Sequence, residues 1–225
     1  YRRMDAGAIG SIVVDYPLQL WPQREPRLMN TVNWLLEHSS VQGAFFQDMI
    51  HSGINAYLTL HLAQVLLRAE DLRWYDLMTS VAELASPTGQ WPEAIHPRTG
   101  GGCMGDGQHA WAAGEWALFV RNLFVREEED HLVIGAGIHR KWLEARGRVS
   151  LGPTLTPWGP VTVRVEPREQ EVRVSWDATW RNSAPPIHVA LPGQPRRVIE
   201  DGSVGEVILP YAREPELEVF SNESP

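Results

Sequence analysis

The apolar residues of this chain change their spacing near residue 127, and this change constrains the fold more than any other feature of the sequence. Before it, apolar side chains recur every three or four positions, as on one face of a helix. After it, they alternate with polar side chains, as in a strand with one buried face. One kind of element cannot satisfy both periods, so the sequence predicts two parts, residues 1–127 and 131–225.

The first part is predicted to be mainly α. Three amphipathic stripes stand out, running through Leu28, Val32, Leu35 and Leu36, then Ile54, Leu58, Leu62, Val65 and Leu66, then Trp74, Leu77, Met78, Val81 and Leu84. The segment 106–125 is apolar nearly all round, which indicates a helix buried on most sides. The apolar stretch 6–14 adds a weaker helix, because glycines disfavour it. We therefore expect about five helices here.

The second part is predicted to be a small antiparallel all-β, sandwich-like domain. Valines at 161, 163 and 165 alternate with polar residues, and Val172, Val174 and Trp176 repeat the pattern beyond a turn at 167–170. Alternating runs separated by turn residues are typical of hairpins in such domains. The charged run 126–130 between the two parts is expected to be a solvated linker.

The amino-acid composition limits the kinds of partner that the chain is expected to bind. The net charge of -8 argues against nucleic-acid binding, which needs clustered lysine and arginine. Cys103 is the only cysteine, so no internal disulfide can form, and the compartment stays open. No apolar run approaches the ~20 residues needed to span a bilayer, so no membrane partner is expected.

The segment 86–105 is unusually long for a helix–helix connection, which normally has about 2–8 residues. Long connections of this kind are commonly functional. This one contains apolar side chains among its turn residues, which is not the composition of a disordered tract. It also concentrates groups capable of chemistry, which with the start of the next helix are Trp91, Glu93, His96, Arg98, Asp106, His109 and Trp111.

A second polar segment is expected to lie beside the first. Successive antiparallel helices alternate in direction, so the segments that precede the helices near 54 and 106 share one end of the bundle. The earlier segment carries Asp48, His51 and Asn55. Polar groups that converge on a partly apolar hollow are the usual form of an active site.

Glycoside hydrolysis suits these groups. The reaction needs two carboxyl groups, one to protonate the leaving oxygen and one to act as base or nucleophile. Glu93 is the candidate base, and the preceding Pro92 stiffens the chain that leads to it. Trp91 and Trp111 offer flat faces on which a sugar ring can stack.

The same segments resemble the glucoamylase-like members of the six-hairpin (α/α toroid) glycosidase superfamily. The resemblance covers roughly residues 1–127. It is carried by Gly89–Glu93 as a Gly-x-x-Pro-Glu turn, by Pro97–Gly100, by the glycines of Gly100–Gly102, by His109–Trp111, and by Gly53–Tyr57 before an aliphatic helix.

The resemblance implies the carboxy-terminal portion of an α/α toroid followed by a β domain. It implies inverting hydrolysis of glycosidic bonds without a cofactor, with Glu93 as general base. The family's general acid lies between earlier helices, so the acid and the rest of the barrel are expected in a missing amino-terminal half or another subunit. The start at Tyr1 rather than at methionine fits that expectation.

Other roles remain open for the site residues. Glu93 and Arg98 could be surface groups, Asp106 a helix cap, and His51 and Asn55 hydrogen-bonding groups at a helix start. His96 and His109 could be structural, and Asp48 and Glu115 are lesser carboxylate candidates. A metal site at His96, Cys103, Asp106 and His109 is not predicted, because the spacing fits no zinc pattern.

Two other functions stay open as well. The chain could be a non-catalytic carbohydrate-binding or interaction module. It could also be a glycoside phosphorylase or sugar epimerase on the same toroid, although a phosphorylase would need phosphate-binding groups where Glu93 stands.

Overall fold

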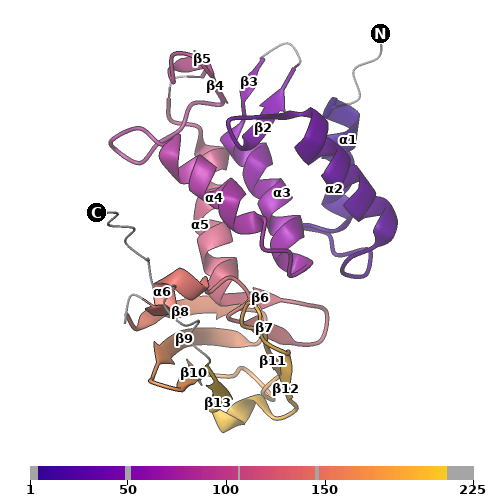
Figure 1. Cartoon of the computed structure of the whole chain (residues 1–225). Helices are drawn as coiled ribbons and strands as arrows, with labels where there is room; N and C mark the ends of the chain where they lie inside the picture. Colours follow the sequence, from indigo (N-terminus) through magenta and orange to yellow (C-terminus); the bar gives the residue numbers. More distant parts are fainter. Residues whose placement is uncertain (1–4, 49–51, 106, 145–146, 212–225) are drawn as a thin grey trace, which may run out of the picture.

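The computed structural model describes residues 5–48, 52–105, 107–144 and 147–211, and shows most of the helices in one half and most of the strands in the other (Figure 1). The helices are α1 (Asp5–Ser11), α2 (Pro26–His38), α3 (Ala56–Arg68), α4 (Trp74–Glu83), α5 (Ala110–Phe124) and α6 (Arg140–Glu144), with short 3₁₀ turns η1 (Ile12–Val14) and η2 (Gly202–Val204).

Helix α3 is the centre of the helical half and packs against α4 and α5. All of its residues except Tyr57 and Leu58 are buried, because leucine and alanine cover most of its circumference. Asn55 begins the helix by accepting a hydrogen bond from the Leu58 amide at 2.9 Å. The three predicted helices are confirmed as α2, α3 and α4, except that Ile54 lies in β3 and Leu84 follows the end of α4.

The segments between the helices form a five-stranded sheet of very short strands in the order β1-β2-β3-β4-β5. Its strands are β1 (Ser40–Val41), β2 (Ala44–Gln47), β3 (Gly53–Ile54), β4 (Ala94–Ile95) and β5 (Gly102–Met104). The labelled strands β2–β5 lie beyond the amino ends of α3 and α5 (Figure 1).

The other half contains two four-stranded sheets, ordered β13-β10-β9-β8 and β12-β11-β7-β6. Their strands are β6 (Val125–Glu127), β7 (Leu132–Ile134), β8 (Val149–Thr156), β9 (Gly159–Pro167), β10 (Glu171–Ala178), β11 (Ile187–Val189), β12 (Arg197–Ile199) and β13 (Glu206–Pro210). The predicted hairpin is confirmed, since Val163 faces Trp176 and Val165 faces Val174 across β9 and β10.

The predicted fold class, a mainly α part followed by a purely antiparallel β domain, is wrong. The chain is 34% helical and 28% strand, with three antiparallel or mixed sheets, and is therefore mixed α/β. The inter-helix segments pair with one another instead of remaining loops, and β7 runs parallel to β11. The packing of α3 against α4 and α5 is compatible with part of a ring of helical hairpins.

The charged run at the boundary is not a solvated linker. Arg126 and Glu128 are only 5% and 8% exposed, and Arg126 belongs to β6, which continues directly from α5. Arg68 of α3 donates to both Glu128 carboxylate oxygens, at 3.2 Å to Oε1 and 3.0 Å to Oε2, and its Nη1 donates to Asp15 at 2.5 Å. The first part of the run is thus a buried junction at which the helices meet the sheets, because buried Glu128 is neutralised by the distant Arg68 and by the adjacent Arg126, whereas Glu129 and Asp130 are exposed.

Helix α5 also begins later than expected, at Ala110 rather than near 106. Within the described ranges, no helix is both long enough and apolar enough to cross a bilayer.

His188 of β11 lies beside His131, the residue immediately before β7. The ring centroids of His131 and His188 are 3.7 Å apart. Both His131 Nε2 and His188 Nδ1 are buried without a hydrogen-bond partner among the described residues. Burial, with smaller contributions from the charges of His131 and Arg196, lowers the pKa of His188 below its usual 6.5.

This pair predicts a loss of stability in acid. A histidine with a lowered pKa in the folded state takes up its proton more readily when unfolded, so stability falls as the pH drops below about 6.5. Urea unfolding of the wild type and His188→Gln at about pH 7.5 and about pH 5.5 should show a smaller acid-dependent loss in the variant. The residual loss in the variant includes His139, whose pKa burial also lowers. An identical pH dependence in both proteins would contradict this role for His188.

Candidate functional site

The two polar inter-helix segments meet, as the helix order predicts. Ile54 of β3 pairs with Ile95 of β4, which joins the segment before α3 to the segment before α5. The His109 amide donates to the Trp91 carbonyl at 2.8 Å, so the chain leading to Glu93 is tied to the start of α5. Gly53 permits the close pairing, because a Cβ there would lie 3.0 Å from Ala94 Cβ and from Cys103 Sγ.

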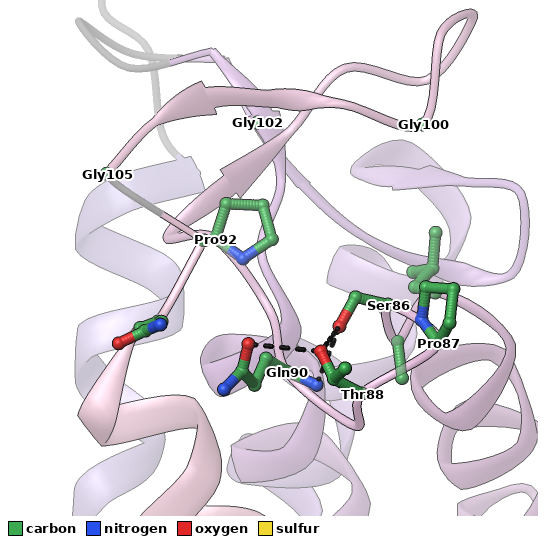
Figure 2. Close-up of a pocket in the computed structure, with 12 residues that line it drawn as sticks. Ser86, Pro87, Thr88, Gln90, Pro92, Gly100, Gly102 and Gly105 are labelled. Carbon is green, nitrogen blue, oxygen red and sulfur yellow. Dashed lines mark hydrogen bonds between the residues drawn. The ribbon is translucent and has the colours of Figure 1, made fainter.

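A hollow of ≈ 610 Å³ opens within the α4–α5 connection, between its first part, 84–90, and the β4–β5 hairpin (Figure 2). Its wall carries uncharged polar groups, in which Thr88 Oγ1 lies 3.1 Å from Ser86 Oγ and donates to Gln90 Oε1 at 3.2 Å. Gly102 lets β5 approach Pro92, since a Cβ at Gly102 would lie 2.9 Å from Pro92 Cβ. Such a wall can form hydrogen bonds with hydroxyl groups, and no acid or base is among the described residues that line it.

Glu93 lies next to this hollow without lining it. Its side chain is half-buried, and no described residue hydrogen-bonds or forms an ion pair with its carboxylate. Gly105, the residue after β5, has φ +79° and lies close to Glu93. A Cβ at Gly105 would be 3.3 Å from the Glu93 amide nitrogen. The fold thus places Glu93, whose carboxylate has no partner among the described residues, close to the point where the two segments pair.

An aromatic cluster stands at the amino ends of α3 and α5. The ring of Tyr57 lies 5.6 Å from that of Trp111 and 6.3 Å from that of His109, measured between centroids. Trp111 is 67% exposed, which is unusual for so large an apolar side chain. An exposed indole supported by neighbouring rings offers a flat face for a planar or sugar ligand.

Several other predicted site residues have local structural roles. Trp91 is buried and its indole N–H donates to the Val81 carbonyl at 2.8 Å, so its faces belong to the core. Asn55 caps α3. His96 Nδ1 accepts hydrogen bonds from the amides of Arg98 and Thr99, which closes a turn at the surface.

The remaining predicted residues do not join the cluster or cannot be placed. The Arg98 and Asp48 side chains are exposed. His51 and Asp106 lie outside the described residues.

A buried polar group lies beneath the aromatic cluster, and the sequence analysis named only its carboxylate, Glu115, without the partners on α3. Gln64 donates to Glu115 Oε1 at 2.9 Å and to the Tyr16 hydroxyl at 3.1 Å, and His61 Nε2 lies 3.5 Å from Glu115 Oε2. Desolvation and the Glu115 charge raise the pKa of both Tyr16 and Tyr57 above the usual value. The signal was present, because positions 57, 61, 64 and 68 follow the helical period along an otherwise apolar helix.

Three or more potential metal ligands do not come together anywhere in the part of the chain that is described. Comparison with known proteins adds no assignment: no family model, no curated protein and no solved structure matches this chain.

The buried position of Glu115 predicts a large structural effect. Glu115→Ala should lower the free energy of unfolding by about 2 kcal/mol or more, because Gln64 and His61 lose the group that satisfies them. Urea unfolding measures this, with exposed Glu83→Ala on α4 as the control. Equal losses in the two variants would show that the buried hydrogen bonds contribute nothing.

Proposed function

We propose that this chain supplies the carboxy-terminal part of an inverting glycoside hydrolase, with Glu93 as the general base. The observation that carries the proposal is the pairing of Ile54 with Ile95, which brings an unengaged carboxylate and two polar segments to the same end of α3 and α5. Exposed Trp111 stands at that end as a stacking face. The resemblance of Gly89–Glu93 and His109–Trp111 to glucoamylase-like enzymes supplies the reaction class.

In this proposal Glu93 takes a proton from water while the water attacks the anomeric carbon. The reaction also needs a general acid to protonate the leaving oxygen. Glu115 is poorly suited to that role because it is buried and engaged by Gln64 and His61. We therefore assign the acid to further helices, in the same polypeptide or another subunit.

The outer face of α5 is consistent with such a neighbour. Trp111 and Leu118 are 67% and 41% exposed, and Ala113, Gly114 and Ala117 between them are exposed as well. Small residues allow another helix to approach closely, and a face of this kind on a helix is usually covered. Helices packed here would border the aromatic cluster.

A non-catalytic carbohydrate-binding module is the second candidate. It is favoured by the exposed indole of Trp111, which needs no carboxylate to bind a sugar ring, and by the engagement of Glu115 elsewhere. Binding without any release of sugar separates this candidate from the first.

Sugar binding should depend on Trp111. In affinity electrophoresis against soluble glucans, Trp111→Ala should weaken retention by about tenfold, the effect of losing one aromatic stacking partner. Trp34→Ala on α2 removes a 36% exposed indole away from the site and should leave retention unchanged. Equal retention of wild type and Trp111→Ala would remove the stacking face from the proposal.

Turnover should depend on Glu93. In the active assembly, Glu93→Gln should reduce the release of sugar by at least about 10²-fold, because the amide cannot accept the proton of water, while glucan binding persists. Glu83→Gln, an exposed change on α4, is the matched control. Undiminished turnover by Glu93→Gln would overturn the assignment of the base.

A further inference from the structure

A hollow of ≈ 500 Å³ lies where the helical half meets the β half. Leu72 lines it from the connection between α3 and α4, and Tyr211, the residue after β13, lines it from the β half. Helix α6, which lies on the side of the β half that faces the helices (Figure 1), and the turn 191–194 between β11 and β12 form its other walls. Because Leu72 follows the carboxy end of α3 and Glu93 lies near the amino end, this hollow is separate from the proposed active site.

The wall of this hollow is mostly apolar. Its apolar residues come from separate segments of the chain, and they are Leu72, Ile138, Leu143, Leu191, Pro192 and Pro210. The turn beside them borders open space, because a Cβ at Gly193 would meet no atom within 4 Å. Sites for small molecules usually have a volume of about 300–1,000 Å³ and a predominantly apolar lining with a few polar groups. The hollow therefore has the size and the lining of such a site.

Arg140, the first residue of α6, brings a positive charge to this wall. Its guanidinium carbon lies 6.0 Å from the ring centroid of Tyr211, which lines the same hollow. Burial lowers the pKa of the neighbouring His139 and the charge of Lys141 lowers it further, so the His139 ring is uncharged at neutral pH. No acid is among the described residues that line the hollow, although the chain as a whole has a net charge of -8. The wall thus combines apolar surface with a single cation.

The existing partner of Arg140 does not prevent an anion from binding. Arg140 Nε donates to Glu144, one turn further along α6, at 2.8 Å. The two side chains are 35% and 45% exposed, so water reaches both of them. An exposed ion pair at this spacing contributes little to stability, because water solvates both charges. A guanidinium also has several N–H donors, so it can bind a ligand carboxylate beside Glu144 or in its place.

We propose that this hollow binds a small apolar molecule that carries one carboxylate, with its apolar body against Leu72 and Leu191 and its carboxylate on Arg140. Burial of the apolar body supplies the driving force, and the charge-assisted bond to the guanidinium selects the anion. A single cation suits a monoanion better than a phosphate, since no lysine, serine or threonine is among the described residues that line the hollow. This proposal is independent of the role assigned to Glu93.

Titration of the chain with sodium 4-phenylbutanoate at about pH 7.5, followed by ligand-observed NMR, tests the site. We expect saturable binding of this probe, which has both an aromatic body and a carboxylate. 4-Phenylbutanamide has the same body without the charge and should bind at least about tenfold more weakly. Sodium acetate has the charge without the body and should show no saturable binding. Equal affinity for 4-phenylbutanoate and either of the other two probes would contradict the proposed class of ligand.

Two sets of variants locate the binding of 4-phenylbutanoate. Arg140→Gln should weaken it by about tenfold, whereas Arg168→Gln, an exposed change in the turn between β9 and β10, should leave it unchanged. Leu72 is 54% exposed at the wall, so it can be replaced without disturbing the core. Leu72→Glu should bind the probe more weakly than the matched neutral Leu72→Gln. The proposal is overturned if the wild type shows no saturable binding, if Arg140→Gln binds as the wild type does, or if the two Leu72 variants have equal affinity.

Discussion

The rest of the structure depends on the buried ion pairs that the Arg68 guanidinium forms. It lies at the carboxy end of α3 and donates to Asp15, which follows η1, and to Glu128, which follows β6. One buried cation thus connects the amino-terminal segment, the central helix and the first sheet of the β half. Breaking such a buried pair by removing one partner typically costs about 3–5 kcal/mol, because a charge remains without compensation.

Because its carboxy end is held in this way, α3 fixes the positions of the segments that pack at its amino end. Its first turn receives the segment that carries β2 and β3, and its neighbour α5 receives the segment that carries β4 and β5. The short sheet forms because these two segments are brought to the same end by the helices. Glu93, one residue before β4, and Tyr57, in the first turn of α3, are consequently near the same junction.

The polar face of α3 connects the two ends of the helical half. It runs from Tyr57 through His61 and Gln64 to Arg68, with Glu115 and Asn122 of α5 bonded to Gln64. One end of this face reaches the aromatic cluster, and the other reaches the junction with β6 through Glu128. Because side chains along it are hydrogen-bonded to one another, the network holds these two ends in a fixed relation.

The sequence by itself determined the local elements. Helices α2, α3 and α4 and the β9–β10 hairpin were predictable because their apolar periods extend over many residues. The convergence of the two polar segments also followed from the sequence, since it depends only on the alternation of helix direction.

Tertiary structure decided the rest. Strands of two residues such as β3 and β4 carry no period, so the pairing of Ile54 with Ile95 depends on packing between distant segments. Trp91 was predicted to line a sugar site, but it is part of the core. Its indole N–H donates to the Val81 carbonyl there, which makes burial of the ring possible. The charged run 126–130 looked like a solvated linker, yet Arg126 and Glu128 are buried. A sequence shows a residue's charge but not the partner that can neutralise it, and here that partner, Arg68, lies about 60 residues earlier in the chain.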